Sequence, residues 1–436
     1  MSDRRTFRFT GRFFDLPGDD KTLILNRTLN LESSVRNTVA AIIARVRQSG
    51  DRALREMALE LDRVELTDLE VPRARLEEAL DSVSPNLRAA MERSVRNLRA
   101  FHEFQRPVAS SITIEPGVTL GRRPDPFDRV GIYAPGGRAA YPSSVLMGAV
   151  PAKIGGVREV ILCSPPVTGG LPSASVMAAA QLAGVDRVFA VGGAGAIAAM
   201  SLGTATIPRS SKVVGPGNAY VAEAKLQLAT AAAFDSPAGP SELLVIADET
   251  ANAEAVTREV LAQAEHDPKA IVMVVAIGEV VAARIETMIS SEMLSARRSE
   301  IIAESLSSRG GVVSVTSRAE AVEISNSFAP EHLLIATSNP DEMLEQIRNA
   351  GTVFLGESSS VAFGDYMTGA NHVLPTGGLA QSYSGLSALD FIRWTTFQTV
   401  TPDAAAAMAN DVSVFAEAEG LYAHGTSAMA WARGSQ

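Results

Sequence analysis

A glutamine and a histidine three residues apart could hold one metal ion. Gln263 and His266 lie at the end of residues 252–264, where apolar residues recur on one helical face, and Pro268 follows at once. Residues three apart share a face of a helix, so a carbonyl oxygen and an imidazole nitrogen could point at the same ion. The same spacing also fits two ordinary surface residues. It therefore predicts a metal site only in company with further donors.

The other histidines of the chain are candidates for those donors. There are five in all, and four follow residue 260, each in a distinctive segment: His266, His332, His372 and His424, with His102 standing apart. Taken singly, Asp365 could be a turn residue, Glu331 and His332 a capping pair, and His424 a tail residue. Together, a carbonyl from Gln263 with His266, Asp365 and His424 makes a thiolate-free set of oxygen and nitrogen donors. Such a set suits zinc or a similar divalent ion.

Composition excludes several classes of function. The 436 residues carry a net charge of −10, which argues against a nucleic-acid binder. Cys163 is the single cysteine, so no intrachain disulfide and no thiolate cluster can form. No apolar run is long enough to span a membrane, and the first residues lack the apolar segment of a secretory signal. We therefore predict a cytoplasmic protein that acts on a small molecule, with no nucleic-acid or membrane partner.

Periodicity predicts an α/β fold. Residues 31 to about 102 read as helices, and 112–120 as a short hairpin. Apolar strands then alternate with helices in two regions, with strands predicted at 129–134, 159–163, 187–191 and 212–214, and again at 242–248, 271–276, 311–315, 333–336 and 352–355. This alternation is typical of wound, mainly parallel sheets. We expect two Rossmann-like domains, with an extended N-terminal arm and a small helical C-terminal segment.

The expected boundaries follow from these patterns. Residues 1–30 would be the arm, lying on another subunit; 31–132 with 242–386 the first α/β domain; 133–241 the second; and 387–436 the C-terminal segment. Glycine-bearing turns at 135–137, 192–193 and 215–217 follow strands of the second domain. Ligands of open α/β sheets bind at that edge, so these turns favour a nucleotide or phosphate near helix N-termini.

Long motifs in a fixed order give the chain a family resemblance. They are Val130-Gly-Ile-Tyr-Ala-Pro-Gly-Gly137, Ala140-Tyr-Pro-Ser-Ser-Val-Leu-Met147, Val214-Gly-Pro-Gly-Asn218, Ala238-Gly-Pro-Ser-Glu242, Gln263-Ala-Glu-His-Asp-Pro268, Pro330-Glu-His-Leu333, Asn371-His-Val-Leu-Pro-Thr376 and Glu419-Gly-Leu-Tyr-Ala-His424. Over almost its whole length the chain resembles the histidinol dehydrogenases. The resemblance implies oxidation of L-histidinol to L-histidine, in histidine biosynthesis, by two hydride transfers to NAD through an enzyme-held aldehyde.

The resemblance also implies roles for single residues. One zinc ion per subunit would be held by Gln263, His266, Asp365 and His424, the last from the partner subunit of a homodimer. Its role would be mainly to orient the substrate through the amino and imidazole nitrogens. Ser241, His372 and Glu419 match substrate-contacting positions, as do the four zinc ligands and His332. His332 would be the base for the alcohol, and Glu331 would activate water for the second oxidation.

The dinucleotide positions match less completely. Tyr133 and Asn218 correspond to NAD contacts of the family. The NAD-contacting glutamine, however, is replaced by Gly195 in Gly192-Gly-Ala-Gly-Ala196. We therefore expect either weaker cofactor binding or an orientation supplied by the backbone.

Three alternatives stay open at this point. The same scaffold could oxidise another polar alcohol, such as a sulfonated diol or an amino alcohol. A non-catalytic relative would bind metal or ligand without turnover, although the intact Glu331-His332 pair and all four expected ligands argue against it. A zinc hydrolase would need an open water position and no dinucleotide.

Overall fold

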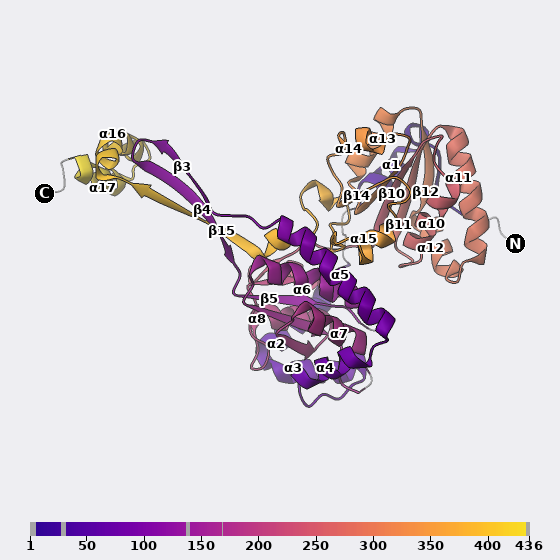
Figure 1. Cartoon of the computed structure of the whole chain (residues 1–436), viewed down its shortest axis with the longest axis horizontal. Helices are drawn as coiled ribbons and strands as arrows, with labels where there is room; N and C mark the ends of the chain where they lie inside the picture. The colour runs from indigo at the N-terminus through magenta and orange to yellow at the C-terminus, as the bar shows by residue number, and fades with distance from the viewer. Residues whose placement is uncertain (1–5, 28–31, 137–139, 168, 433–436) are drawn as a thin grey trace. The chain divides into compact units, whose positions relative to one another are not determined.

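The computed structural model describes residues 6–27, 32–136, 140–167 and 169–432. The chain forms two compact units (Figure 1). The first comprises Met1–Gln105 and Asp128–Phe391, and the second Arg106–Phe127 and Ile392–Gln436. Two six-stranded sheets, here named sheet A and sheet B, lie in the first unit, and a three-stranded sheet lies in the second. The predicted α/β class is confirmed.

Sheet A carries the residues predicted for catalysis. Its strands run in the order β1 (Phe9–Arg12), β12 (Gly311–Val315), β11 (Ile271–Ile277), β10 (Glu242–Ala247), β13 (His332–Ala336) and β14 (Thr352–Leu355), and all neighbours are parallel. Every residue of β10 and β13 is buried. Parallel strands read as continuous apolar runs because helices cover both faces.

Two apolar cores flank sheet A, since successive side chains of a strand point to opposite faces. Leu243 and Val245 of β10 enter one core, and Leu244 and Ile246 enter the other. The first core is completed by α10 (Ala253–Ala264), α11 (Glu279–Glu292) and α12 (Ser299–Arg309). The second is completed by α1 (Gly18–Leu25), α13 (Arg318–Phe328) and α14 (Pro340–Leu344) (Figure 1).

Sheet B has the strand order of a dinucleotide-binding fold. The order is β2 (Glu70–Val71), β7 (Arg187–Ala190), β6 (Glu159–Ser164), β5 (Arg129–Tyr133), β8 (Lys212–Val214) and β9 (Ala233–Phe234). All neighbours are parallel except β2, which is antiparallel to β7. In chain order β7, β6, β5 and β8 are the third, second, first and fourth parallel strands. The switch point, where such sheets bind ligands, therefore falls between β5 and β8.

The helices around sheet B come from two stretches of the chain. They are α2 (Ser33–Ser49), α3 (Asp51–Met57) with a π-helical extension (Ala58–Asp62), α4 (Arg73–Ser82), α5 (Pro85–Phe104), α6 (Pro142–Gly155), α7 (Ala174–Ala183), α8 (Gly193–Leu202) and α9 (Ala219–Gln227). Helices before residue 105 contact those after 140: α2 packs on α8 and α9, α4 on α7, and α5 on α6.

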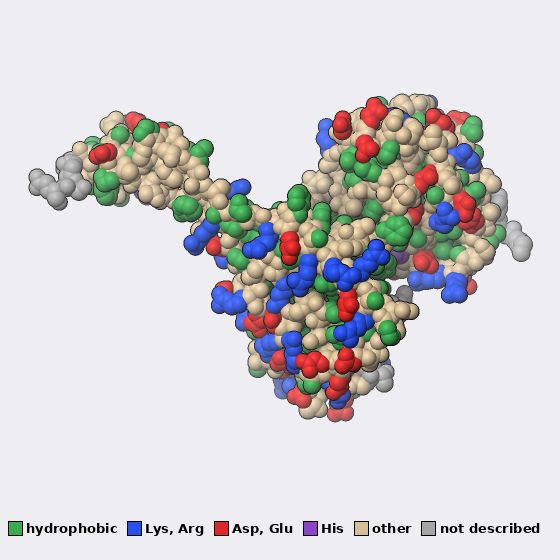
Figure 2. Space-filling model, viewed as in Figure 1, with side chains coloured by type: hydrophobic (Ala, Val, Ile, Leu, Met, Phe, Trp, Pro, Cys, Tyr) green, Lys and Arg blue, Asp and Glu red, His purple; other side chains and the backbone are tan. Residues whose placement is uncertain are grey.

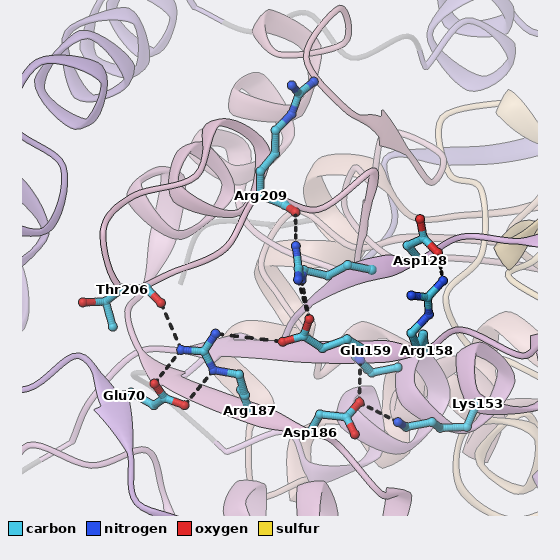
Figure 3. A network of polar contacts seen from close by, with 11 residues as sticks. Glu70, Asp128, Lys153, Arg158, Glu159, Asp186, Arg187, Thr206 and Arg209 are labelled. Carbon is cyan, nitrogen blue, oxygen red and sulfur yellow. Dashed lines mark hydrogen bonds and ion pairs between the residues drawn. The ribbon is translucent and has the colours of Figure 1, made fainter.

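Charged residues join the amino ends of the sheet B strands (Figure 3). Arg187, the first residue of β7, donates through Nε and Nη2 to the two carboxylate oxygens of Glu70 at 2.7 and 2.6 Å. Glu159, the first residue of β6, accepts from Arg129, the first residue of β5, at 2.6 Å. This network lies at the edge opposite to the glycine turns, and we interpret it as structural.

The second unit is an antiparallel sheet with two helices. Its strands run in the order β15 (Ile392–Val400), β4 (Val118–Pro126) and β3 (Ser110–Glu115), and α16 (Pro402–Ala418) packs against α17 (Tyr422–Ala432). All six residues of β3 are exposed. Apolar side chains lie on the surface of this unit, as Figure 2 shows, among them Ile112, Ile114, Phe397, Val414, Phe415 and Tyr422.

The strand pairing differs from the expected boundaries in three places. Residues 9–12 are not part of an arm but form β1, which pairs with β12; residues 1–5 and 28–30 of the expected arm lie outside the described residues. Residues 33–104 pack mainly against helices of sheet B, although Asn97 of α5 also donates to the carbonyl of Met367 at 2.7 Å. Residues 106–127 join residues 392–436 in a separate unit. An amphipathic pattern shows that a helix has an apolar face but not which sheet that face covers.

No helix within the described ranges is both long enough and apolar enough to cross a membrane.

Candidate active site

Gln263 and His266 lie where α10 ends. Gln263 is in the last turn and is 2% exposed, and within the described part of the chain its side-chain nitrogen has no hydrogen-bond partner. His266 lies two residues beyond the helix, and its N–H donates to the carbonyl of Gln263 at 3.3 Å. Neighbouring protein atoms partly desolvate the ring of His266, and this lowers its pKa because desolvation disfavours the imidazolium. A buried amide nitrogen without a partner is rare in proteins, which marks Gln263 as a candidate functional residue.

The carbonyl of Glu242 fixes the tautomer of His332. Nδ1 of His332 lies 3.0 Å from this oxygen, which can only accept, so Nδ1 carries the hydrogen. In the neutral ring Nε2 is then the unprotonated nitrogen. It is buried, has no hydrogen bond among the described residues, and lies 3.5 Å from Oδ1 of Asp365.

Glu331 lies on the other side of the same imidazole. Its Oε2 accepts the N–H of Glu242 at 2.8 Å and lies 3.5 Å from Nδ1 of His332. Burial raises the pKa of Glu331 to about 7, against the opposing charge of His332. Burial alone would lower the pKa of His332, but the carboxylates of Glu331 and Asp365 outweigh it and raise the pKa to about 9. The pair therefore holds a proton near neutral pH.

Asp365 and His372 add two further segments of the chain to the site. It lies on the short helix α15 (Val361–Tyr366), and its backbone carbonyl accepts from Nδ1 of His372 at 2.9 Å. Burial disfavours its carboxylate, but the nearby ring of His332 and the charges of His372 and His266 outweigh this and lower the pKa of Asp365. Burial lowers the pKa of His372. The fold thus brings together four residues that the sequence predicted: His266, His332, Asp365 and His372.

The side chains around Asp365 could supply part of a metal site. Among the residues described, no group of three or more His, Cys, Asp or Glu side chains is arranged to hold a metal ion. The expected set has only His266 and Asp365 of those types in the first unit. Gln263 would add its amide oxygen, and its partnerless amide nitrogen agrees with an amide oriented by a ligand. The donors present therefore fit part of a zinc site, which needs further ligands to be complete.

The remaining substrate positions are divided between the two units. Ser241 immediately precedes β10, and its carbonyl accepts from the N–H of Ile271 at 3.0 Å. Glu419 and His424 belong to the second unit, at the end of α16 and the start of α17, and both are exposed. The first unit by itself therefore brings together only part of the predicted set.

The predicted dinucleotide positions lie at the carboxyl edge of sheet B. Tyr133 ends β5, and its hydroxyl oxygen accepts the N–H of Gly193 at 3.0 Å, at the start of α8. Burial raises the pKa of Tyr133 to about 12, so its hydroxyl stays protonated. Asn218 caps α9: its side-chain oxygen accepts from Tyr220 and Val221 at 3.0 and 3.2 Å.

A buried ion pair holds the turn between β8 and α9. Nζ of Lys225 lies 2.5 Å from Asp235 and donates to the carbonyl of Gly215 at 2.6 Å, while Asp235 accepts the N–H of Gly215 at 2.7 Å. Gly215 has a φ of +124°, and a Cβ there would overlap the carbonyl of Tyr133. Only glycine allows this close approach of β5 and the turn.

The packing around α8 explains why a small residue stands at position 195. It is buried in α8, and a Cβ there would lie 3.1 Å from Cε of Met57 on α3. The methionine therefore occupies space that a longer side chain at position 195 would need.

Sequence reasoning missed two residues that shape the site. Arg27 and Glu242 form an ion pair with Nε–Oε1 at 2.9 Å and side chains only 2% and 1% exposed. Arg27 also donates to the carbonyl of Phe328 at 2.6 Å, and Glu242 accepts the N–H of Gly377 at 2.9 Å. Glu242 belongs to one of the family motifs, but the motif assigns no role to it. Arg27 had no local signal, because Glu242 and Phe328 lie more than 200 residues away from it in the sequence.

Known proteins are similar in sequence to this chain over most of its length. A family model described as histidinol dehydrogenase matches residues 25–431. The histidinol dehydrogenases of Methanosarcina mazei and Methanothermobacter thermautotrophicus are 43% and 45% identical to it, over 91% and 90% of this chain and 92% of each relative. The crystal structure of histidinol dehydrogenase from Elizabethkingia anophelis matches with a TM-score of 0.93 and 33% identity, covering 98% of both chains. The chain belongs to the histidinol dehydrogenase family.

Proposed function

We propose that this protein oxidises L-histidinol to L-histidine with NAD, as a step of histidine biosynthesis. The observation that carries the proposal is the free Nε2 of His332, held toward Asp365 by the bond of Nδ1 to Glu242. Family membership supplies the substrate, because the relatives bear that activity in their names.

His332 is the base for the alcohol. A neutral imidazole whose Nδ1 is protonated presents a lone pair at Nε2, and this lone pair takes the hydroxyl proton as the carbinol carbon gives up a hydride. The β13 backbone and the carbonyl of Glu242 hold the ring in place. A cation bound at Asp365 would oppose the imidazolium and favour the neutral base.

Glu331 serves the second oxidation. The aldehyde must take up water before it can lose a second hydride, and a carboxylate can accept the proton of that water. Its pKa of about 7 lets Glu331 both accept and release a proton near neutral pH. The bond from the N–H of Glu242 fixes one of its oxygens.

Zinc is the metal we propose, held by Gln263, His266, Asp365 and the His424 of a partner subunit. When bound, it would anchor nitrogen donors of the substrate beside His332. His372, whose Nδ1 is held by the carbonyl of Asp365, presents Nε2 to the substrate, and Ser241 and Glu419 complete its contacts.

NAD, when bound, would supply the hydride acceptor for both oxidations. We place it at the carboxyl edge of sheet B, where Tyr133 and Asn218 lie beside the N-termini of α8 and α9. At position 195 the backbone of α8, rather than a glutamine side chain, would face the cofactor.

A homodimer completes the site in this proposal. Glu419 and His424 lie in the second unit, whose β3 and helices expose apolar side chains such as Ile112, Phe415 and Tyr422. Exposed apolar surface of this kind is what a contact between protein chains would bury. A second copy of the chain is the occupant that explains both this surface and the division of the predicted ligands between the units.

The decisive experiment measures NADH formed by zinc-loaded protein from limiting L-histidinol. We expect two NADH per histidinol, abolished by a chelator and restored by zinc. One NADH per molecule would contradict the second oxidation. Turnover of an amino alcohol or a sulfonated diol, with no turnover of histidinol, would show that the substrate is a different alcohol.

A further inference from the structure

Two separate elements carry the zinc ligands that we propose for the first unit. Gln263 and His266 come from the end of α10, and Asp365 comes from α15, about 100 residues later in the chain. A helix of only six residues is not stable on its own, so its position depends on contacts with its surroundings. Ser360, the N-cap of α15, makes no side-chain capping hydrogen bond.

Glu259 takes over the capping of α15. Its Oε2 accepts the N–H of Val361, the first residue of α15, at 3.1 Å. Glu259 is 9% exposed, and within the described residues no lysine or arginine pairs with it. A carboxylate is costly to bury, and here its bond satisfies one of the free N–H groups at the start of a helix. Glu259 thus joins α10 to α15.

The geometry of α10 connects Glu259 to the proposed ligands. Glu259 and Gln263 are four residues apart and share one face of the helix. Asp365 lies one turn along α15 from the N–H that Glu259 holds. The Glu259–Val361 bond therefore sets the distance between donors of two different helices.

A second carboxylate makes a similar contact at the other end of α10. Glu357 accepts the N–H of Asn252, the N-cap of α10, at 2.5 Å. Asn252 is eleven residues before Gln263, roughly 16 Å along the helix axis, whereas Glu259 is about 6 Å away. Glu357 is therefore a matched control, because it joins the same two segments far from the ligands.

The far side of α15 is also fixed. A Cβ on Gly364 would strike the ring of Phe354, at 2.6 Å, and that ring lies 6.0 Å from the ring of His332. This packing fixes α15 against β14, while Glu259 holds the N-terminus of α15 and Asn97 donates to the carbonyl of Met367, its C-cap, at 2.7 Å.

We infer that Glu259 is a positioning residue for the metal site: by holding the N-terminus of α15, it keeps Asp365 at the distance from Gln263 and His266 that a divalent cation requires. This inference rests on the proposed function, since it uses the proposed ligands.

The test is the affinity of the metal-free protein for zinc, measured by competition with a chromogenic chelator. The variants are Glu259→Ala, Glu259→Gln, Glu259→Asp and the control Glu357→Ala, each checked for folding by circular dichroism. We expect Glu259→Ala to weaken zinc binding roughly 10- to 100-fold. Glu259→Gln keeps an acceptor oxygen and should stay within a few-fold of the wild type. Glu357→Ala should bind zinc normally even if its melting temperature falls.

Cobalt substitution gives a second readout. The visible bands of bound Co²⁺ report ligand geometry, so they should change in Glu259→Ala and be restored in Glu259→Gln. If Glu259→Ala does not fold, Glu259→Asp carries the test, because its shorter side chain cannot reach the N–H of Val361 without moving α15.

Each result has a distinct meaning. A wild type that binds no zinc would overturn the proposed metal site itself. A wild type that binds zinc, with Glu259→Ala binding equally well, would overturn the positioning role alone. Glu259→Gln as weak as Glu259→Ala would show that the acceptor oxygen is not what matters, and would also overturn it.

Discussion

Replacing Glu331 by glutamine should lower the pKa of His332. Oε2 of Glu331 lies 3.5 Å from Nδ1 of His332, and Oδ1 of Asp365 lies 3.5 Å from Nε2. At this distance two unit charges interact by about 5 kcal/mol for an effective dielectric constant of about 20, an upper limit because each charge is spread over several atoms. One pKa unit corresponds to about 1.4 kcal/mol, so each carboxylate can raise the pKa of His332 by at most about 3.5.

Burial opposes these two attractions, and the balance places the pKa of His332 at about 9. With glutamine at 331, only Asp365 remains to offset burial. We expect the pKa to fall by about 2 units or more, to near 7 or below. The neutral base then exists at lower pH, so the acid limb of kcat/KM for the first oxidation should also move to lower pH.

The assay is a titration of ¹⁵N-labelled imidazoles by NMR in zinc-free protein. Five histidines make the spectrum tractable, and His332→Gln identifies the signal. The control is Glu304→Gln, on the exposed face of α12, which should leave the midpoint unchanged. A wild-type His332 that titrates at or below pH 6.5, or an equal midpoint in Glu331→Gln, would refute the reasoning.

Three further predictions concern catalysis, stability and cofactor binding. His332→Gln should lower kcat by roughly 10²- to 10⁴-fold with zinc still bound by elemental analysis; normal turnover would remove His332 from the base role. Lys225→Met leaves Asp235 buried without its partner and should lower the free energy of unfolding by about 3–5 kcal/mol in urea denaturation; an unchanged midpoint would show that the pair contributes nothing. Gly195→Gln should destabilise the protein by about 1–3 kcal/mol because its Cβ meets Met57, and adding Met57→Ala should relieve this. Equal melting temperatures for the single and double variants would contradict that explanation.

The sequence alone determined the class of the fold and predicted the chemistry of the site. Apolar runs alternating with helices predicted two parallel sheets, since strand and helix periods are local properties of the chain. The sequence also placed Glu331 and His332 just before a strand, and β13 begins at His332. The zinc ligands, the cofactor contacts and the homodimer stay predictions, resting on matched motifs and on the family to which the chain belongs.

Only the tertiary structure decided how distant segments meet. Residues 9–12 pair with β12 through backbone groups about 300 residues apart, and such bonds leave no mark on side-chain pattern. The carbonyl of Glu242 fixes which ring nitrogen of His332 carries the hydrogen. Glu259 holds the N-terminus of α15, although the two lie about 100 residues apart in the sequence. A side chain's type states which bonds it can make. Which partner it finds depends on how complementary surfaces pack, and that is a property of the whole fold.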